Sequence, residues 1–354
     1  MEFELILTEC YSLGLPMSTQ YSAEVSPIVE SSRLGVLFPG ALGDFICCLP
    51  ALQVLARSGR VEVFARSEFS AIAPDGIVVR SLERAEISRL FTATAAADEA
   101  VYHLFAEYSA VYSWMGISQA VFVASLQAVT QGRARIFPFR SADGSCHQAE
   151  YYFGCLHGSG SEIPLPSISI CPEAIAWREA FWQRHSLTRR RVLVIAPGSG
   201  AVAKNWPENH FSEVAEWWRD RMNGSVVVLV GPVEEERGGF TALSSHGLTL
   251  HNLDLAKAAA LLEGSSLYVG NDSGITHLAA ATGTQTVALF GPSNPRQWAP
   301  RGRKVFVLSR HEECLTLDRT IANSLTPHQC LSGLESDAVI RILAQFMGVP
   351  TLTR

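Results

Sequence analysis

Short, uninterrupted apolar runs recur along the sequence and constrain the fold more than any other feature. Segments with helical periodicity alternate with these runs, a pattern typical of parallel βαβ units. Because the runs do not alternate apolar with polar residues, we expect strands that helices cover on both faces. The runs form two series, a first at 33–38, 61–65, 110–114 and 134–139, and a second at 192–198, 226–232, 267–272 and 286–292.

The length of the chain agrees with two series of strands. Its 354 residues exceed what one hydrophobic core usually organises, so two α/β domains are expected. The sequence predicts a flexible extension over 1–31, an N-terminal Rossmann-like domain over 32–170, a C-terminal one over 171–334 and a final helix within 335–354. We interpret the final helix as an element that packs back on the N-terminal domain. Ligands should bind in a cleft at the carboxyl ends of the strands.

Composition and charge exclude several classes of protein. Hydrophobic residues make up 47% and charged residues 18% of the chain, which argues against disorder. The net charge of -6 gives no electrostatic basis for binding nucleic acid. The sequence has no apolar stretch of about 20 residues and no secretory signal, so we expect a cytoplasmic protein with at most peripheral contact with the inner face of the membrane. The eight cysteines are irregularly placed and are expected to be reduced.

The motif PGALGDF at 39–45 links the first predicted strand to the first predicted helix. Gly40 and Gly43 permit a tight turn and a close backbone approach. Asp44 has two interpretations. It either stabilises the start of the helix, as acidic side chains commonly do, or acts as a general base on an attacking hydroxyl. Its place after the first strand favours the second interpretation.

The motif APGSGAVAKNWP at 196–207 runs from a strand into a loop that contains Ser199 and Gly200. Backbone N–H groups of such loops can bind phosphate oxygens. Lys204 would add a positive charge beside a departing diphosphate. Its spacing is not that of a Walker A loop, so the alternative of an exposed surface lysine stays open.

The motif GNDSGITHLAAATG at 270–283 joins a strand to a helix through Asp272, Ser273 and Gly274. The N–H groups at this helix start, together with the helix dipole, suit a pyrophosphate. Asp272 is a candidate for orienting a donor hydroxyl or the neighbouring lysine. His277 lies one turn further along and is either a ligand-binding residue or a structural histidine.

The motif GPVEEER at 231–237 places three carboxylates where a helix should begin after a strand. Surface acids that complement a helix dipole are the ordinary explanation. Glu234 has a second interpretation, because acidic residues just beyond a strand accept hydrogen bonds from ribose hydroxyls in nucleotide-binding domains.

These motifs together, PGALGD, K-x-W-P, GPVEEE and GNDSGITHLAAA with ALFGPSNPRQW, resemble glycosyltransferase family 9, the heptosyltransferases of lipopolysaccharide core assembly. The resemblance covers about 33–347. It implies an α/β GT-B fold, in which two Rossmann-like domains with parallel sheets face a cleft. It also implies a donor nucleotide in the C-terminal domain and an acceptor in the N-terminal domain. Transfer would be inverting, with no metal or other cofactor, from an ADP-linked or related sugar nucleotide to a lipopolysaccharide-core or other glycan or glycolipid acceptor.

The resemblance also assigns roles by motif. Asp44 matches the family's proposed catalytic base and Lys204 the lysine that contacts the donor phosphates. The other donor-binding positions are Ser199, Gly200, Glu234, Leu253, Asp272, Ser273, Gly274 and His277, and Gly40 and Gly43 belong to the acceptor-side loop. Phe38 departs from the family, which often has arginine or lysine there, so an acceptor-side charge is expected to be missing. Cys314 and Cys330 fall near a cysteine cluster of some relatives, but two thiols without a CxxC motif predict no metal site.

Other classes of protein stay open as alternatives. A protein of the same fold that binds nucleotide sugars without turnover fits the same motifs. Sugar-nucleotide epimerases share the architecture but not the motif spacing. A dehydrogenase is disfavoured because no G-x-G-x-x-G follows the first strand.

Overall fold

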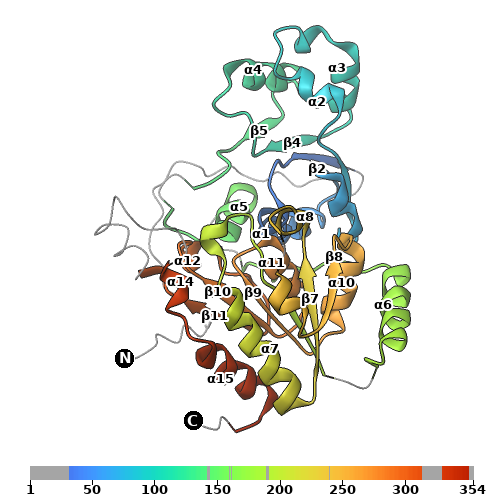
Figure 1. Ribbon diagram of the computed structural model, residues 1–354. Helices are drawn as coiled ribbons and strands as arrows, with labels where there is room; N and C mark the ends of the chain where they lie inside the picture. The colour runs from blue at the N-terminus through green and yellow to red at the C-terminus, as the bar shows by residue number, and fades with distance from the viewer. Residues whose placement is uncertain are drawn as a thin grey trace. The chain divides into compact units, whose positions relative to one another are not determined.

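A computed structural model describes residues 32–141, 144–158, 160, 162–188, 191–238, 240–312 and 329–350. The chain divides into two compact units (Figure 1), one within 15–169 and one that contains 170–354, here called the N-terminal unit and the C-terminal unit. The predicted extension over 1–31 lies outside the described residues.

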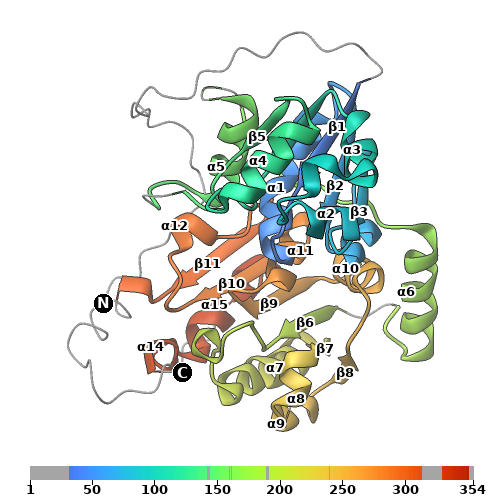
Figure 2. The same ribbon diagram turned by 90° about the horizontal axis from the view of Figure 1, so that it is seen from above.

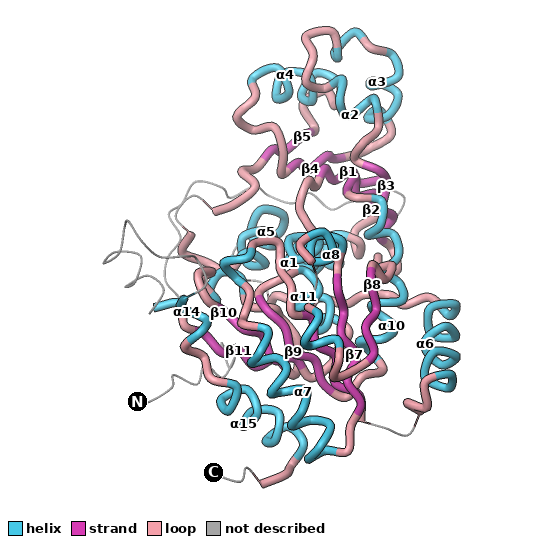
Figure 3. Tube along the Cα trace, viewed as in Figure 1, coloured by secondary structure: helices cyan, strands magenta, loops and turns pink. Residues whose placement is uncertain are grey.

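The N-terminal unit is built on a five-stranded sheet in the order β3-β2-β1-β4-β5, with every pair of neighbours parallel. Its strands are β1 (Arg33–Leu37), β2 (Arg60–Ala65), β3 (Ile77–Ser81), β4 (Ala110–Ser113) and β5 (Ala134–Ile136). Its helices are α1 (Leu42–Leu55), α2 (Ala85–Arg89), α3 (Glu99–Ala106), α4 (Ala120–Val129) and α5 (Gln148–His157). Figure 3 shows the strands in magenta at the centre of this unit.

The first series of apolar runs forms β1, β2, β4 and β5. The run at 134–139 is strand only as far as Ile136, because Pro138 has no N–H to donate to a ladder. The sequence analysis missed β3, whose sequence IVVRS ends in polar residues and is too short to stand out. Cys47 and Cys48 lie in α1 and are buried there.

The C-terminal unit contains a six-stranded parallel sheet in the order β11-β10-β9-β6-β7-β8. Its strands are β6 (Val192–Ala196), β7 (Ser225–Val230), β8 (Leu248–His251), β9 (Leu267–Asn271), β10 (Thr286–Phe290) and β11 (Val305–Ser309). Its helices are α6 (Pro172–Arg184), α7 (Glu208–Met222), α8 (Pro232–Glu236), α9 (Thr241–Ser244), α10 (Leu255–Glu263), α11 (Gly274–Ala281), α12 (Pro295–Trp298), α14 (Gln329–Ser332) and α15 (Ser336–Met347). The order reverses between β6 and β9, which makes the ends of these two strands the switch point where ligands bind in open α/β sheets.

Helices cover both faces of this sheet, as the continuous apolar strands predicted. The apolar residues Phe211, Val214, Ala215 and Trp218 of α7 are fully buried and pack with alternate residues of β6, β7 and β9 in one core. Tyr268 of β9 faces the other side, where its hydroxyl meets Thr276 of α11. The helices α7 and α15 therefore lie on one face and α11 on the other (Figure 2).

The final helix corrects one expectation. We interpreted 335–354 as a helix that packs back on the N-terminal domain. In the structure α15 places Ala338, Val339 and Leu343 in the core of its own unit, beside α7. The reason is the apolar stripe of α15, which together with α7 covers one face of the sheet. Among the described residues, no helix is both long and apolar enough to cross a bilayer.

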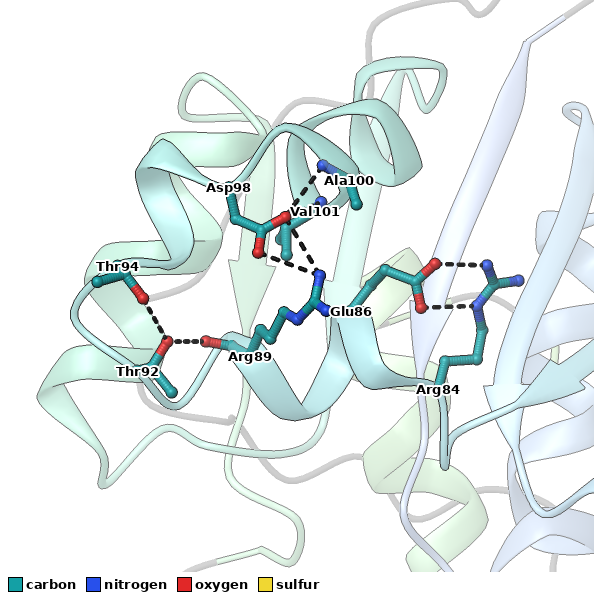
Figure 4. A network of polar contacts seen from close by, with 8 residues as sticks. All are labelled: Arg84, Glu86, Arg89, Thr92, Thr94, Asp98, Ala100 and Val101. Atoms are coloured by element: carbon teal, nitrogen blue, oxygen red, sulfur yellow. Dashed lines mark hydrogen bonds and ion pairs between the residues drawn. The ribbon is translucent and has the colours of Figure 1, made fainter.

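Ion pairs and a helix cap join α2 to α3 (Figure 4). Asp98 is the N-cap of α3 and accepts hydrogen bonds from the backbone N–H groups of Ala100, at 3.0 Å, and Val101, at 3.2 Å. The same carboxylate pairs with Arg89 of α2 at 3.1 Å, while Arg84 pairs with Glu86 at 2.8 Å. Because these pairs are exposed to solvent, they contribute little to the free energy of unfolding. Their main effect is to orient the two short helices.

Glu62 is a carboxylate in the middle of β2 whose side chain is only 3% exposed. It accepts hydrogen bonds from Arg33 at 2.8 Å, from Arg80 at 3.3 Å and from the Tyr108 hydroxyl at 3.1 Å. Burial alone raises the pKa of Glu62, but these donors outweigh burial and hold the pKa below its usual value. The folded chain therefore holds Glu62 in its ionised form.

This network predicts how stability depends on pH. Because the pKa of Glu62 is lower in the folded state, its contribution is present above the unfolded pKa of about 4.3 and is lost as pH falls through the folded pKa. We expect Glu62→Gln to lower the free energy of unfolding by about 1–3 kcal/mol at neutral pH. Below about pH 5, the free energy of unfolding of the variant should fall less steeply with pH than that of the wild type. Thermal unfolding across this range, with the exposed Glu68→Gln as control, tests both results, and equal acid sensitivity in both variants would contradict them.

Candidate functional site

A pocket of about 240 Å³ lies at the carboxyl ends of the strands in the C-terminal unit. Its apolar lining comes from the ends of β7 and β8 and from the start of α10, and its polar lining from the loop after β6 and the start of α11. The lining residues are Ala196, Gly198, Ser199, Gly200, Leu229, Val230, Gly231, Pro232, Glu234, Leu250, Asn252, Leu253, Ala258, Ser273 and Ile275. The volume is below the roughly 300–1,000 Å³ of pockets that enclose a whole drug-sized ligand, so this pocket suits one end of a nucleotide.

Five of the predicted donor-binding residues meet at this pocket. Ser199, Gly200, Glu234, Leu253 and Ser273 all line it, although they come from four separate segments of the sequence. The separate segments meet because each follows a parallel strand, and parallel strands end at the same edge of the sheet. The assignment of roles within the pocket stays a prediction.

The loop after β6 is held by its own polar side chains. The Ser199 hydroxyl lies 2.7 Å from the backbone oxygen of Ala201 and 2.7 Å from Oδ1 of Asn205, and its single proton can serve one of them at a time. Ser199 is 3% exposed, so its side chain fixes the loop rather than projecting from it. Hydrogen bonds from this loop to an anion would then come from backbone N–H groups.

Lys204 and Asp272 form an ion pair beside this loop. The Lys204 ammonium lies 2.6 Å from Oδ2 of Asp272, whose side chain is 8% exposed while that of Lys204 is 35% exposed. Lys204 is therefore held by a carboxylate while its side chain stays in contact with solvent, and its role stays a prediction.

Asn271 is a residue that the sequence analysis passed over. It is fully buried at the end of β9, donates a hydrogen bond from Nδ2 to the backbone oxygen of Pro197 at 2.7 Å, and accepts one on Oδ1 from the N–H of Trp206 at 3.0 Å. One side-chain amide thus fixes both ends of the loop that contains Lys204. The signal was an asparagine at the end of an apolar strand, next to the motif that carries Asp272.

The start of α11 has no side-chain cap. Ser273 is the N-cap by position but makes no side-chain hydrogen bond to the helix backbone, and Asp272 pairs with Lys204 instead. The Ser273 hydroxyl lies 3.1 Å from the hydroxyl of Thr276. The first N–H groups of a helix have no intrahelical partner, and the start of α11 reaches the pocket through Ser273 and Ile275. His277 is 4% exposed and does not line the pocket.

Glu234 lies against two glycines. A Cβ atom added to Gly198 would stand 2.2 Å from Cγ and 2.3 Å from Oε1 of Glu234, and one added to Gly231 would stand 2.7 Å from Oε2. The lack of side chains at these two positions is what lets the Glu234 carboxylate lie between the ends of β6 and β7. The acid is therefore placed in the pocket rather than directed to solvent like its neighbours.

This close approach yields a prediction on binding. We expect Gly198→Ala to displace the Glu234 side chain and to weaken the binding of a nucleoside diphosphate roughly tenfold, the loss of about one hydrogen bond. Glu234→Ala should weaken binding to a similar degree. In the Glu234→Ala background the second change should have little further effect, because the clashing side chain is gone. Isothermal titration calorimetry of the four proteins tests this, and additive effects would show that Gly198 acts through something other than Glu234.

Asp44 lies in the first turn of α1, two residues after the helix begins. One carboxylate oxygen, Oδ2, accepts a hydrogen bond from the N–H of Ala41 at 3.2 Å, which supports the interpretation that Asp44 stabilises the helix start. The other oxygen, Oδ1, is buried and makes no hydrogen bond within the part of the chain that the structure describes. One oxygen of the carboxylate therefore stabilises the start of the helix. The second oxygen is left without a hydrogen bond among the described residues.

The environment of Asp44 corrects the expectation of a missing charge. Phe38 is fully buried among Phe45, Trp114 and Tyr152, so this position is a core position. The Arg140 guanidinium nevertheless lies 3.6 Å from Oδ1 of Asp44. A cation is thus present beside the predicted base, supplied by the segment after β5. Sequence reasoning missed it because nothing local links Arg140 to the motif at 39–45.

The prediction of no metal site stays a prediction, and the cysteine prediction is corrected at one residue. The described residues contain no group of three or more His, Cys, Asp or Glu side chains able to hold a metal ion. Cys330 is disulfide-bonded, which corrects the expectation that all thiols are reduced. Cys314 lies outside the described residues.

Solved structures define the fold first. The fold is similar to that of a family 9 glycosyl transferase from Veillonella parvula, with a TM-score of 0.71 at 20% identity over 91% of this chain and 99% of that one. It is also similar to Escherichia coli ADP-heptose LPS heptosyltransferase II, with a TM-score of 0.65 at 18% identity over 89% of this chain and 98% of that one. With two parallel α/β units, the chain has the GT-B fold.

Sequence comparison then shows a similarity over about half of the chain. Residues 160–325 match glycosyltransferase family 9 (heptosyltransferase). The chain is 35% identical over 123 residues to lipopolysaccharide heptosyltransferase 1 of Pseudomonas aeruginosa, an alignment that spans 34% of this chain and 35% of that protein. The segment 160–325 is therefore similar to glycosyltransferase family 9, and the chain spans about a third of the length of the curated relatives it matches.

Proposed function

We propose that this protein is a glycosyltransferase that moves a heptose or a related sugar from an ADP-linked donor to a lipopolysaccharide-core or other glycan acceptor. The observation that carries the proposal is the pocket of the C-terminal unit, where a carboxylate, a glycine- and serine-containing loop and a helix start meet beside the Lys204–Asp272 pair. The names of two relatives, an ADP-heptose LPS heptosyltransferase and a lipopolysaccharide heptosyltransferase, support the choice of donor and acceptor.

The proposed chemistry is a single displacement that inverts the anomeric carbon. Asp44 removes the proton from an acceptor hydroxyl, and the hydroxyl oxygen forms the new bond to the anomeric carbon as the bond to the diphosphate breaks. Negative charge grows on the departing diphosphate, where Lys204 and the start of α11 at Gly274 stabilise it. These groups handle the charge without a metal ion. Because Asp44 and Lys204 belong to different units, the reaction requires that a ligand engage both.

Within the pocket, the proposal divides the donor into parts. The apolar residues Leu229, Leu250 and Leu253 suit the flat face of a nucleobase, and Glu234 suits the ribose hydroxyls as an acceptor of hydrogen bonds. The loop at Ser199 and the start of α11 suit the phosphates.

A nucleotide screen tests the proposal. We expect ADP and ADP-heptose to raise the melting temperature of the full chain more than UDP, GDP or CDP do, since a ligand that binds only the folded state stabilises it. Mass spectrometry of ADP-heptose mixed with truncated lipopolysaccharide should then show the acceptor gain one sugar. If no nucleoside diphosphate changes the melting temperature, the donor pocket is misassigned.

A nucleotide-sugar-binding protein without turnover is the second candidate. It is favoured by the hydrogen bond that Oδ2 of Asp44 accepts from Ala41, since a purely structural carboxylate would make the same contact. Tight binding of ADP-heptose with neither transfer nor donor hydrolysis across several acceptors would select this candidate. Any turnover that depends on Asp44 would exclude it.

A further inference from the structure

Three hydroxyl groups meet where β9 joins α11. The hydroxyl oxygen of Thr276 lies 2.9 Å from that of Tyr268 and 3.1 Å from that of Ser273. Thr276 and Tyr268 are fully buried, whereas Ser273 is partly exposed and lines the pocket. The cluster therefore joins the interior of the C-terminal unit to the pocket, and Thr276 is its central member.

The single proton of Thr276 has a fixed destination. The Thr276 hydroxyl donates to the backbone oxygen of Asn271, and a carbonyl oxygen can only accept a hydrogen bond. A hydroxyl has one proton and two lone pairs, so the Thr276 oxygen meets both neighbouring hydroxyls as an acceptor. Tyr268 donates to one lone pair. Burial raises the pKa of Tyr268, so this phenol keeps its proton at neutral pH.

A glycine makes room for this arrangement. Gly270 lies on the same face of β9 as Tyr268, and a Cβ atom added to it would stand 2.2 Å from the Tyr268 hydroxyl oxygen. The lack of a side chain at this position is what lets the phenol reach Thr276. Because both hydroxyls are fully buried, water does not compete for their hydrogen bonds.

The direction of the Ser273 hydroxyl follows from the proton of Thr276. The Thr276 oxygen has no proton left for Ser273, so the contact of 3.1 Å is a hydrogen bond only when Ser273 donates. With its proton directed at Thr276, Ser273 presents a lone pair to the pocket. That lone pair is not used as a helix cap, because the Ser273 side chain makes no hydrogen bond to the backbone of α11. Ionised phosphate oxygens only accept hydrogen bonds, so a ligand hydroxyl suits this lone pair and a phosphate does not.

We propose that Ser273 accepts a hydrogen bond from a hydroxyl group of the bound nucleotide sugar, and that Thr276 is the positioning residue that sets this polarity. The inference rests on the proposed function. It gives the start of α11 two partners. The backbone N–H groups bind a phosphate, while the Ser273 side chain selects a hydroxyl of the ribose or of the transferred sugar.

Calorimetric titration with matched ligands tests the role of Ser273. The ligands are ADP, 2′-deoxy-ADP, 3′-deoxy-ADP and ADP-heptose. We expect Ser273→Ala to weaken the binding of ADP-heptose roughly 3- to 10-fold, the loss of one neutral hydrogen bond. If the partner is a ribose hydroxyl, ADP loses the same factor and one of its deoxy forms loses nothing. If the partner belongs to the sugar, ADP binds the wild type and the variant equally.

Two results would overturn the role of Ser273. A loss shared by ADP and both of its deoxy forms would mean that the Ser273 side chain contacts a phosphate. An unchanged affinity for ADP-heptose would mean that it contacts no part of the donor.

Thr276→Val tests the positioning. Valine keeps the shape of threonine but has no oxygen, so the Ser273 proton is free to turn into the pocket. The wild type should prefer the ligand that carries the hydroxyl over the ligand that lacks it, and in Thr276→Val this preference should fall roughly 2- to 5-fold. Thr276→Ser keeps a hydroxyl and should keep the preference.

Tyr268→Phe is the matched control. It removes an equally buried hydroxyl from the same cluster but leaves the contact between Thr276 and Ser273. Both Tyr268→Phe and Thr276→Val should lower the melting temperature, because each leaves a buried polar group without its partner. Only Thr276→Val should lose the ligand preference. Equal losses of preference in these two variants, or none in Thr276→Val, would refute the role of Thr276.

These binding measurements separate the inference from the proposed function, since they need no acceptor and no turnover. If the wild type binds ADP-heptose but transfers no sugar, the proposed function fails and the result on Ser273 still stands. If the wild type transfers sugar while Ser273→Ala loses the same factor on ADP and both deoxy forms, the function stands and the inference fails. A wild type that binds none of the ligands refutes both.

Discussion

Asp44→Asn is expected to lower kcat for sugar transfer by roughly 10²- to 10⁴-fold, the usual contribution of a general base. Asparagine is nearly isosteric and its side-chain oxygen can still accept the hydrogen bond from Ala41, so α1 should keep its start. What the amide lacks is a basic oxygen in the place of the buried Oδ1. Initial rates with ADP-heptose and truncated lipopolysaccharide measure the effect.

Two further measurements sharpen the Asp44 result. The melting temperature and the ADP affinity of Asp44→Asn should equal those of the wild type, because the donor pocket lies in the C-terminal unit. Asp75→Asn, an exposed aspartate of the same unit, should have normal rates. Near-normal transfer by Asp44→Asn would mean that Asp44 only stabilises the start of α1 and that the general base is another group.

Lys204→Met is expected to lower kcat/KM by roughly 10²- to 10³-fold, the effect typical of removing one preorganised charge from a developing anion. It should also destabilise the fold by about 1–2 kcal/mol, since Asp272 loses its partner while it is largely buried. The two effects have different origins and can be separated.

The double variant Lys204→Met, Asp272→Asn separates them. A neutral amide at 272 needs no counterion, so the melting temperature should recover most of what Lys204→Met loses. The catalytic defect should remain, because no cation has been restored. If transfer recovered together with stability, Lys204 would act only by holding the loop and would not contact the diphosphate.

The division between sequence and structure is clearest at the donor pocket. The apolar runs and the residues that follow them could be identified in the sequence. Their proximity could be predicted because the carboxyl ends of parallel strands lie at the same edge of a sheet. Ser199, Glu234 and Ser273 were found in this way, Leu253 came from the family resemblance, and all four line one pocket. Asn271 was not found, because its two hydrogen bonds join Pro197 and Trp206 across more than sixty positions of sequence.

The sequence by itself predicted four strands of each sheet and the candidate residues after them, because these depend on local periodicity and on motifs of fixed spacing, but it missed β3, β8 and β11. Only the tertiary structure showed what Asp44, Phe38 and α15 contact. A buried aromatic cluster brings Arg140 to Asp44, although the two are far apart in the chain. The physical reason is that ion pairs and packing contacts depend on distances of a few ångströms. The number of residues between two positions in a sequence does not give the distance between them in space.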